Sequence, residues 1–163
     1  MASQIVSQVK GGFIADHKPT LELLHELIET CRDGETGYVH AAAIINDPEL
    51  KVYFTEQAKE RTRLLAELTE EARRHGESKP NISGSVAGVL HRAWFEAKAD
   101  LGLGDQAILN SVEMGEDAAK KAYKEALDED LSDLVRALVQ RQAQSVFAAH
   151  DRVRDFRDRR KAA

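Results

Sequence analysis

The sequence predicts an all-α protein built from two antiparallel helical hairpins that are joined by a long crossover. Four stretches carry apolar residues at alternating three- and four-residue spacing, which is the pattern of one buried helix face. The chain has only three prolines, and no stretch shows the two-residue alternation of a strand. Two short turns and one long connection separate the four stretches, and this order favours two hairpins over a simple up-and-down bundle.

The first hairpin is expected to consist of helices over 21–45 and 48–75. Thr20 is the predicted N-cap of the first helix, and Asp47 is the predicted N-cap of the second. Gly76 is the predicted end of the second helix, because glycine adopts the left-handed backbone that often follows a helix. The turn between the two helices has only one or two residues, so they should be antiparallel neighbours.

The crossover and the second hairpin follow in order. Residues 77–85 are turn-rich, and a short helix is expected over 86–101 within the crossover. The second hairpin is predicted as helices over 106–127 and 131–156, and Gly102, Gly104 and Asp105 are expected to end the crossover helix and to cap the first helix of this hairpin. One bundle domain over 19–158 is therefore expected, with an N-terminal arm before it and a charged end after it.

The arm is expected to comprise residues 1–18 and the charged end residues 159–163. The formal net charge of −5 disfavours nucleic acid as the main partner. A single cysteine excludes an internal disulfide and fits a reducing cytoplasm. No run approaches the roughly 20 apolar residues of a membrane span, so neither a membrane nor a signal peptide is expected.

Two acids fall on the inward positions of these helices. Glu116 lies in the middle of an otherwise apolar face, and Glu35 occupies the same kind of position in the first helix. A buried acid without a partner costs several kcal/mol or stays protonated. Counting from each turn at about 1.5 Å per residue places Gln57 level with Glu35, and Gln142 level with Glu116. We therefore expect one polar layer at mid-height in the bundle.

This layer has two interpretations. In the preferred one it is structural: the amides hydrogen-bond the acids and set the register of the helices, and no cofactor is expected. Arg61, also on an inward position, would neutralise either acid, which argues against a metal. In the alternative, carboxylates bind iron or manganese, for which they are suitable ligands. The candidate metal ligands are Glu35, Glu116, Gln57, Gln142 and Glu60.

Several longer strings point to a known family. They are CRDGETGY at 31–38, NDPELKVYF at 46–54, GSVAGVLHRAW at 84–94, GEDAAKKAY at 115–123 and RQ…AHDRV at 141–153. Over about 20–158 the chain resembles an uncharacterised bacterial family of ferritin-like four-helix-bundle proteins, a domain of unknown function often linked to stress conditions. The resemblance implies the ferritin-like fold and no established reaction.

The resemblance also sharpens the choice between the two interpretations. Ferritin-like di-metal bundles supply one Glu from each of two helices and a Glu-x-x-His pair from each of the others. Here Gln57 to Glu60 and Gln142 to Ser145 stand in those places, and neither contains a histidine. We therefore expect a non-enzymatic, stress-associated bundle that acts through self-association or a protein partner. A metal-binding protein with iron or manganese redox or storage activity is the alternative.

Overall fold

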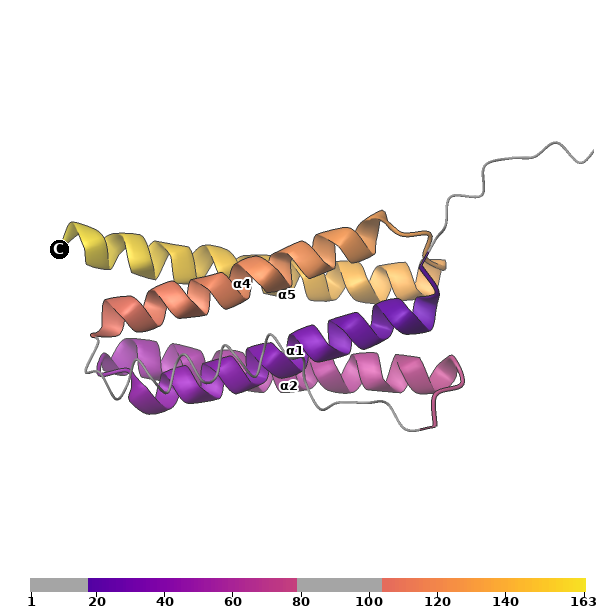
Figure 1. The fold of residues 1–163 in the computed structure, drawn as a ribbon, viewed down its shortest axis with the longest axis horizontal. Coiled ribbons are helices and arrows are strands. Elements are labelled where there is room, and N and C mark those ends of the chain that lie inside the picture. Colours follow the sequence, from indigo (N-terminus) through magenta and orange to yellow (C-terminus); the bar gives the residue numbers. More distant parts are fainter. Residues whose placement is uncertain (1–17, 79–103) are drawn as a thin grey trace, which may run out of the picture.

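The computed structural model describes residues 18–78 and 104–163, and within these residues every regular element is a helix (Figure 1). The predicted all-α class is confirmed. Residues 1–17 of the predicted arm and the predicted crossover helix over 86–101 lie outside the described residues. The helices are α1 (Thr20–Ile44), α2 (Pro48–Arg74), α4 (Asp105–Asp128) and α5 (Asp133–Ala162).

The predicted ends of α2 are confirmed. Asp47 Oδ1 accepts hydrogen bonds from the backbone N–H groups of Glu49 at 2.9 Å and Leu50 at 3.2 Å. These bonds satisfy two of the donors that every helix N-terminus leaves without an intrahelical partner. Gly76 follows the helix with φ +95°, a backbone conformation that other residues rarely adopt.

The predicted cap of α1 is wrong, and of the residues predicted to cap α4 only Gly104 is the N-cap. Pro19, with an extended backbone, occupies the N-cap position of α1, and Thr20 is already the first helical residue. Gly104 occupies the N-cap position of α4, and Asp105 is the first residue of that helix. Asp105 does not cap α4 because its carboxylate turns toward the neighbouring hairpin.

The Asp105 carboxylate joins the two hairpins at one end of the bundle. Its carboxylate accepts the backbone N–H groups of Asn46 at 2.9 Å and Asp47 at 3.0 Å, and the guanidinium of Arg160 at 3.0 Å. Arg160 also donates to the Asp47 carboxylate at 3.0 Å. These contacts hold the last turns of α5 against the α1–α2 turn, so α5 continues to Ala162 where the apolar pattern predicts an end at 156.

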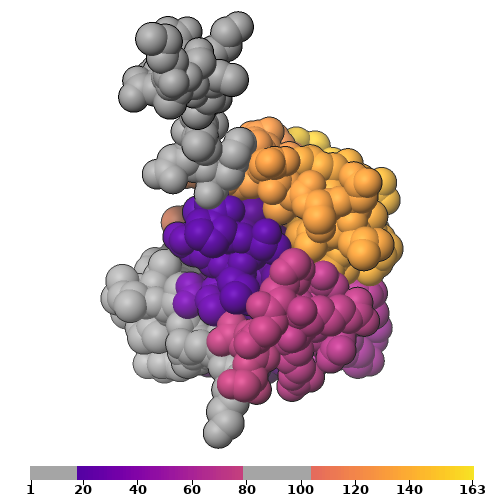
Figure 2. All heavy atoms as spheres, turned by 90° about the vertical axis from the view of Figure 1, so that its right-hand side faces the viewer, coloured from indigo at the N-terminus to yellow at the C-terminus, as the bar shows by residue number. Residues whose placement is uncertain are grey.

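The helices form two antiparallel hairpins that pack side by side. α1 contacts α2 and α4, whereas α5 packs closely on α4 and only sparsely on α2. His25 in the first turns of α1 pairs with Glu77 just after α2, and α4 starts beside the α1–α2 turn. Residues 75–104 therefore connect opposite ends of the bundle, and α2 and α4 run in the same direction (Figure 1). Figure 2 looks onto the end at which α2 finishes and α5 begins.

The apolar core has two parts with a polar layer between them. One part lies toward the α4–α5 turn and includes Leu27, Leu68, Tyr123 and Val139. The other lies toward the α1–α2 turn and includes Tyr38, Phe54, Leu109 and Val153. The predicted inward residues of α4 are all buried, and they are Leu109, Val112, Glu116, Ala119, Tyr123 and Ala126.

Candidate functional site

An ion pair between Arg61 and Glu116 occupies the centre of the polar layer. Nη2 of Arg61 donates to both carboxylate oxygens of Glu116, each at 2.7 Å. The two side chains are 1% and 3% exposed, so the pair is sealed from solvent. Burial alone would lower the pKa of Arg61, but Glu116 together with Tyr38, Cys31 and Tyr123 raises that pKa above its usual value. The guanidinium therefore remains charged beside the carboxylate.

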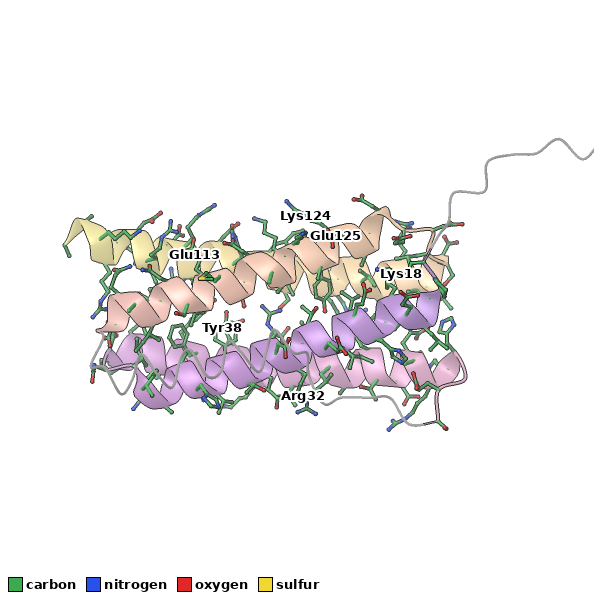
Figure 3. The ribbon with its side chains drawn as sticks, in the orientation of Figure 1. Lys18, Arg32, Tyr38, Glu113, Lys124 and Glu125 are labelled. Atoms are coloured by element: carbon green, nitrogen blue, oxygen red, sulfur yellow. The ribbon has the colours of Figure 1, made fainter. Side chains whose placement is uncertain are left out.

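The neighbours of Arg61 explain how so large a side chain enters the core. A Cβ atom at Gly34 would lie 3.3 Å from Cδ of Arg61, so the glycine of α1 leaves the space through which Arg61 passes. The Tyr38 ring lies 5.9 Å from Cζ of Arg61, and Figure 3 shows Tyr38 inside the bundle. Burial and the nearby Glu116 charge raise the pKa of Tyr38, which keeps its hydroxyl protonated.

A second polar group lies beside the ion pair, toward the α4–α5 turn. Tyr123 Oη donates to Gln142 Oε1 at 2.8 Å, and Cys31 Sγ lies 3.2 Å from the same hydroxyl. Gln142 Nε2 donates to Leu64 O at 3.1 Å and to Glu67 Oε2 at 2.8 Å. A continuous chain of hydrogen bonds thus runs from a buried thiol to a carboxylate at the surface. Burial raises the pKa of Cys31, so its thiol stays protonated.

Glu35 lies at the edge of the bundle, not in the layer. Its side chain is 23% exposed, and it accepts hydrogen bonds from Arg32 at 2.9 Å and Thr62 at 3.1 Å. Thr62, the residue after Arg61, lies on α2, so Glu35 is at the contact between α1 and α2.

The other predicted ligands also remain apart. Gln57 is half-buried, and Gln142 is engaged with Tyr123 and Glu67 as described above. Glu60 binds Arg63 at 2.7 Å and accepts from Ser145 at 2.8 Å. Glu35, Glu116, Gln142 and Glu60 thus each bind different partners.

As a donor set, these residues do not fit a di-metal centre. The guanidinium of Arg61 already binds both carboxylate oxygens of Glu116. In the two stretches that the structure describes, no three His, Cys, Asp or Glu side chains are grouped to hold a metal ion. Metal binding by this layer therefore stays a prediction from the sequence.

Three partners in this network were not identified from the sequence. Thr62 binds Glu35, Ser145 binds Glu60, and Glu67 completes the hydrogen bonding of Gln142. Of these three residues, only Glu67 could have been identified from the sequence. A buried glutamine needs acceptors for its amide hydrogens, and Glu67 lies three residues after inward-facing Leu64, on the flank of the same face.

A comparison with protein families identifies the chain. A family model described as "Domain of unknown function (DUF2383)" matches residues 19–129. The chain belongs to this family. The matched residues of DUF2383 include both Arg61 and Glu116, whereas Gln142 lies beyond the match. No curated protein matches the sequence. None of the four helices, over the residues described, is long and apolar enough to cross a lipid bilayer.

Proposed function

We propose that this DUF2383 protein is a non-enzymatic, ferritin-like helical bundle whose centre is closed by an ion pair in place of a metal. The observation that supports this proposal is the sealed contact between Arg61 and Glu116. A guanidinium bound through both carboxylate oxygens supplies the positive charge that a metal ion would otherwise supply to Glu116. The protein then acts through self-association or a protein partner, in a bacterial cytoplasm and under stress conditions.

The connectivity of the helices supports the ferritin-like assignment. Ferritin-like bundles consist of two antiparallel pairs joined by one long crossover. Residues 75–104 connect opposite ends of this bundle, and α1 lies between α2 and α4. The mid-height layer of such a fold is where its metal-binding members place their ligands, and Arg61 and Glu116 lie between the two apolar parts of this core.

A structural role suits the energetics of the pair. Removing two charges from water costs several kcal/mol per ion, and their mutual attraction often does no more than offset that cost. Such a pair contributes little net stability compared with well-packed apolar residues. Its benefit is specificity, because any other register of α2 against α4 would leave both charges buried and unpaired.

Metal analysis of protein purified from iron- and manganese-supplemented cells tests this proposal. We expect far less than one metal ion per chain, with the same content in the Glu35→Ala/Glu116→Ala variant. Near-stoichiometric iron or manganese that disappears in this variant would establish the metal-binding alternative. Glu56→Ala/Glu125→Ala is the matched control, because both of these acids are exposed.

The proposed mode of action has its own test. Sedimentation velocity over a series of protein concentrations measures self-association directly, and affinity capture with the purified full chain measures binding of a protein partner. A chain that stays monomeric and captures no protein above the level of an unrelated bundle would contradict action through assembly.

A further inference from the structure

His150 of α5 is a buried titratable group that takes no part in the central ion pair. Its side chain is 8% exposed and lies at the contact between α4 and α5. Nε2 lies 2.8 Å from Oδ1 of Asp117 on α4. Nδ1 lies 3.0 Å from Oδ1 of Asp151 and 3.3 Å from Nζ of Lys120 on α4. Both ring nitrogens are therefore engaged, and Nδ1 has two partners.

The contact with Asp117 determines where the proton of the neutral ring lies. An ionised carboxylate only accepts hydrogen bonds, so Nε2 must donate to Asp117. Nε2 then carries a hydrogen whether the ring is charged or neutral. In the neutral ring, Nδ1 is consequently left without a hydrogen.

The two contacts of Nδ1 are alternatives. A ring nitrogen either donates a hydrogen bond or accepts one, whereas the Lys120 ammonium only donates and the Asp151 carboxylate only accepts. The neutral ring therefore accepts from Lys120, and the charged ring donates to Asp151. Histidine is the side chain whose charge ordinarily changes between pH 5 and 8.

The other charged groups of this cluster surround the same contacts. Asp151 lies 3.8 Å from Nζ of Lys120 and 3.5 Å from Nη2 of Arg154. The hydrogen bond from His150 and the charges of Arg154 and Lys120 lower the pKa of Asp151, so this acceptor is ionised. Among the described residues, no charged side chain of α1 or α2 forms an ion pair or hydrogen bond with the ring.

We propose that His150 is a pH-dependent switch on the α4–α5 face. The neutral ring joins Asp117 to Lys120, whereas the charged ring joins Asp117 to Asp151 and releases Lys120. Because Nε2 donates to Asp117 in both states, the exchange at Nδ1 changes the partner of Lys120 without separating α4 from α5. Protonation thus adds one positive charge to this face and frees an ammonium group on it.

Ring nitrogen signals of the wild-type chain test this assignment. Two-bond ¹H–¹⁵N correlation spectra of the ¹⁵N-labelled full chain report the proton on each ring nitrogen, and His150→Gln identifies the signals. At pH 8 we expect a neutral ring with its hydrogen on Nε2, and at pH 5 we expect both nitrogens to carry one. A neutral ring with its hydrogen on Nδ1, or one protonation state throughout this range, would overturn the proposal.

Two variants test the partners of Nδ1 separately. At pH 8 the Nδ1 signal should lie at lower ¹⁵N frequency in wild type than in Lys120→Met, because wild type retains the hydrogen bond to that nitrogen. Lys121→Met is the matched control, since Lys121 is exposed and pairs with Glu125, and it should leave the signal unchanged. Equal frequencies in wild type and Lys120→Met would refute the contact with Lys120.

The acid form has a corresponding test. At pH 5 the Nδ1–H proton should exchange slowly enough to be observed in wild type, and this signal should be lost in Asp151→Ala. Asp155→Ala removes an exposed acid of the same helix and should retain the signal. An Nδ1–H signal that persists in Asp151→Ala, or is absent from wild type, would contradict the exchange of partners.

Discussion

Glu35 and Glu116 occupy equivalent positions in their hairpins, yet they have different environments. Glu116 is 3% exposed and bound by a buried arginine, whereas Glu35 is 23% exposed and bound by Arg32 and Thr62 at the edge of the bundle. The difference accompanies the position of Arg61, whose side chain passes Gly34 of α1 and reaches Glu116 inside the bundle. The cation that binds Glu35 is Arg32, which is itself partly exposed. An inward pattern alone thus does not bury an acid, because the cation that binds the acid must be buried as well.

The largest contrast is expected from removing each acid in turn. Glu116→Ala leaves the Arg61 charge buried without a partner, and we expect a loss of about 3–5 kcal/mol in the free energy of unfolding. Glu35→Ala removes a partly exposed pair and should cost less than about 1 kcal/mol. Urea unfolding of both variants measures the difference. Equal losses would mean that the two acids are not distinguished by burial.

Replacing the ion pair as a unit sharpens the contrast. Since both charges disappear together, Arg61→Met/Glu116→Leu should be as stable as wild type or more stable by about 1–4 kcal/mol. Urea unfolding of the double variant and of each single variant completes a double-mutant cycle. A double variant as unstable as Glu116→Ala would show that Arg61 and Glu116 stabilise the fold by more than neutralising each other's charge.

Substituting the two glycines of α1 in turn tests whether Arg61 needs the absence of a side chain at Gly34 in particular. A Cβ atom at Gly37 would meet nothing within 4 Å, whereas one at Gly34 would press on Cδ of Arg61 at 3.3 Å. Gly37→Ala should therefore gain up to about 1 kcal/mol of stability from helix propensity, and Gly34→Ala should gain clearly less or lose stability. Thermal unfolding of the two variants makes the comparison, and equal gains would remove Gly34 from the explanation.

The smallest expected effect is a dependence of stability on pH at Glu67, an edge acid that supports a buried amide. Burial alone would raise the pKa of Glu67, but hydrogen bonds from Gln142 and Arg141 and the charges of Arg63 and Arg141 together leave that pKa below its usual 4.5. The stabilisation from a lowered carboxyl pKa is present above the unfolded-state value and is lost as the pH falls through the folded-state value. Between about pH 5 and 3, wild type should therefore lose more stability than Glu67→Gln. Acid titrations followed by circular dichroism measure this loss. If the stability of wild type and that of Glu67→Gln fall equally with pH, the prediction is contradicted.

Much of the fold could be predicted because its signals are local. Asp47 and Gly76 mark the ends of α2 through hydrogen bonds and backbone preferences that act within a few residues. The inward face of α4 was predicted in full, including Glu116, because one helix period extends along its whole length. Of the residues predicted to cap α4, Gly104 is the N-cap and Asp105 is not, since the Asp105 carboxylate binds the turn of the other hairpin, and nothing near it in sequence shows that contact.

The sequence alone determined the helical class, the order of the helices and the presence of an acid in the core of α4. Only the tertiary structure decided which side chains meet that acid. Arg61 is long enough to reach several neighbours, and its direction depends on the absence of a side chain at Gly34 on another helix. Helix periodicity acts over a few residues of one segment, whereas the pairing of buried charges depends on the space left between segments that are distant in the chain.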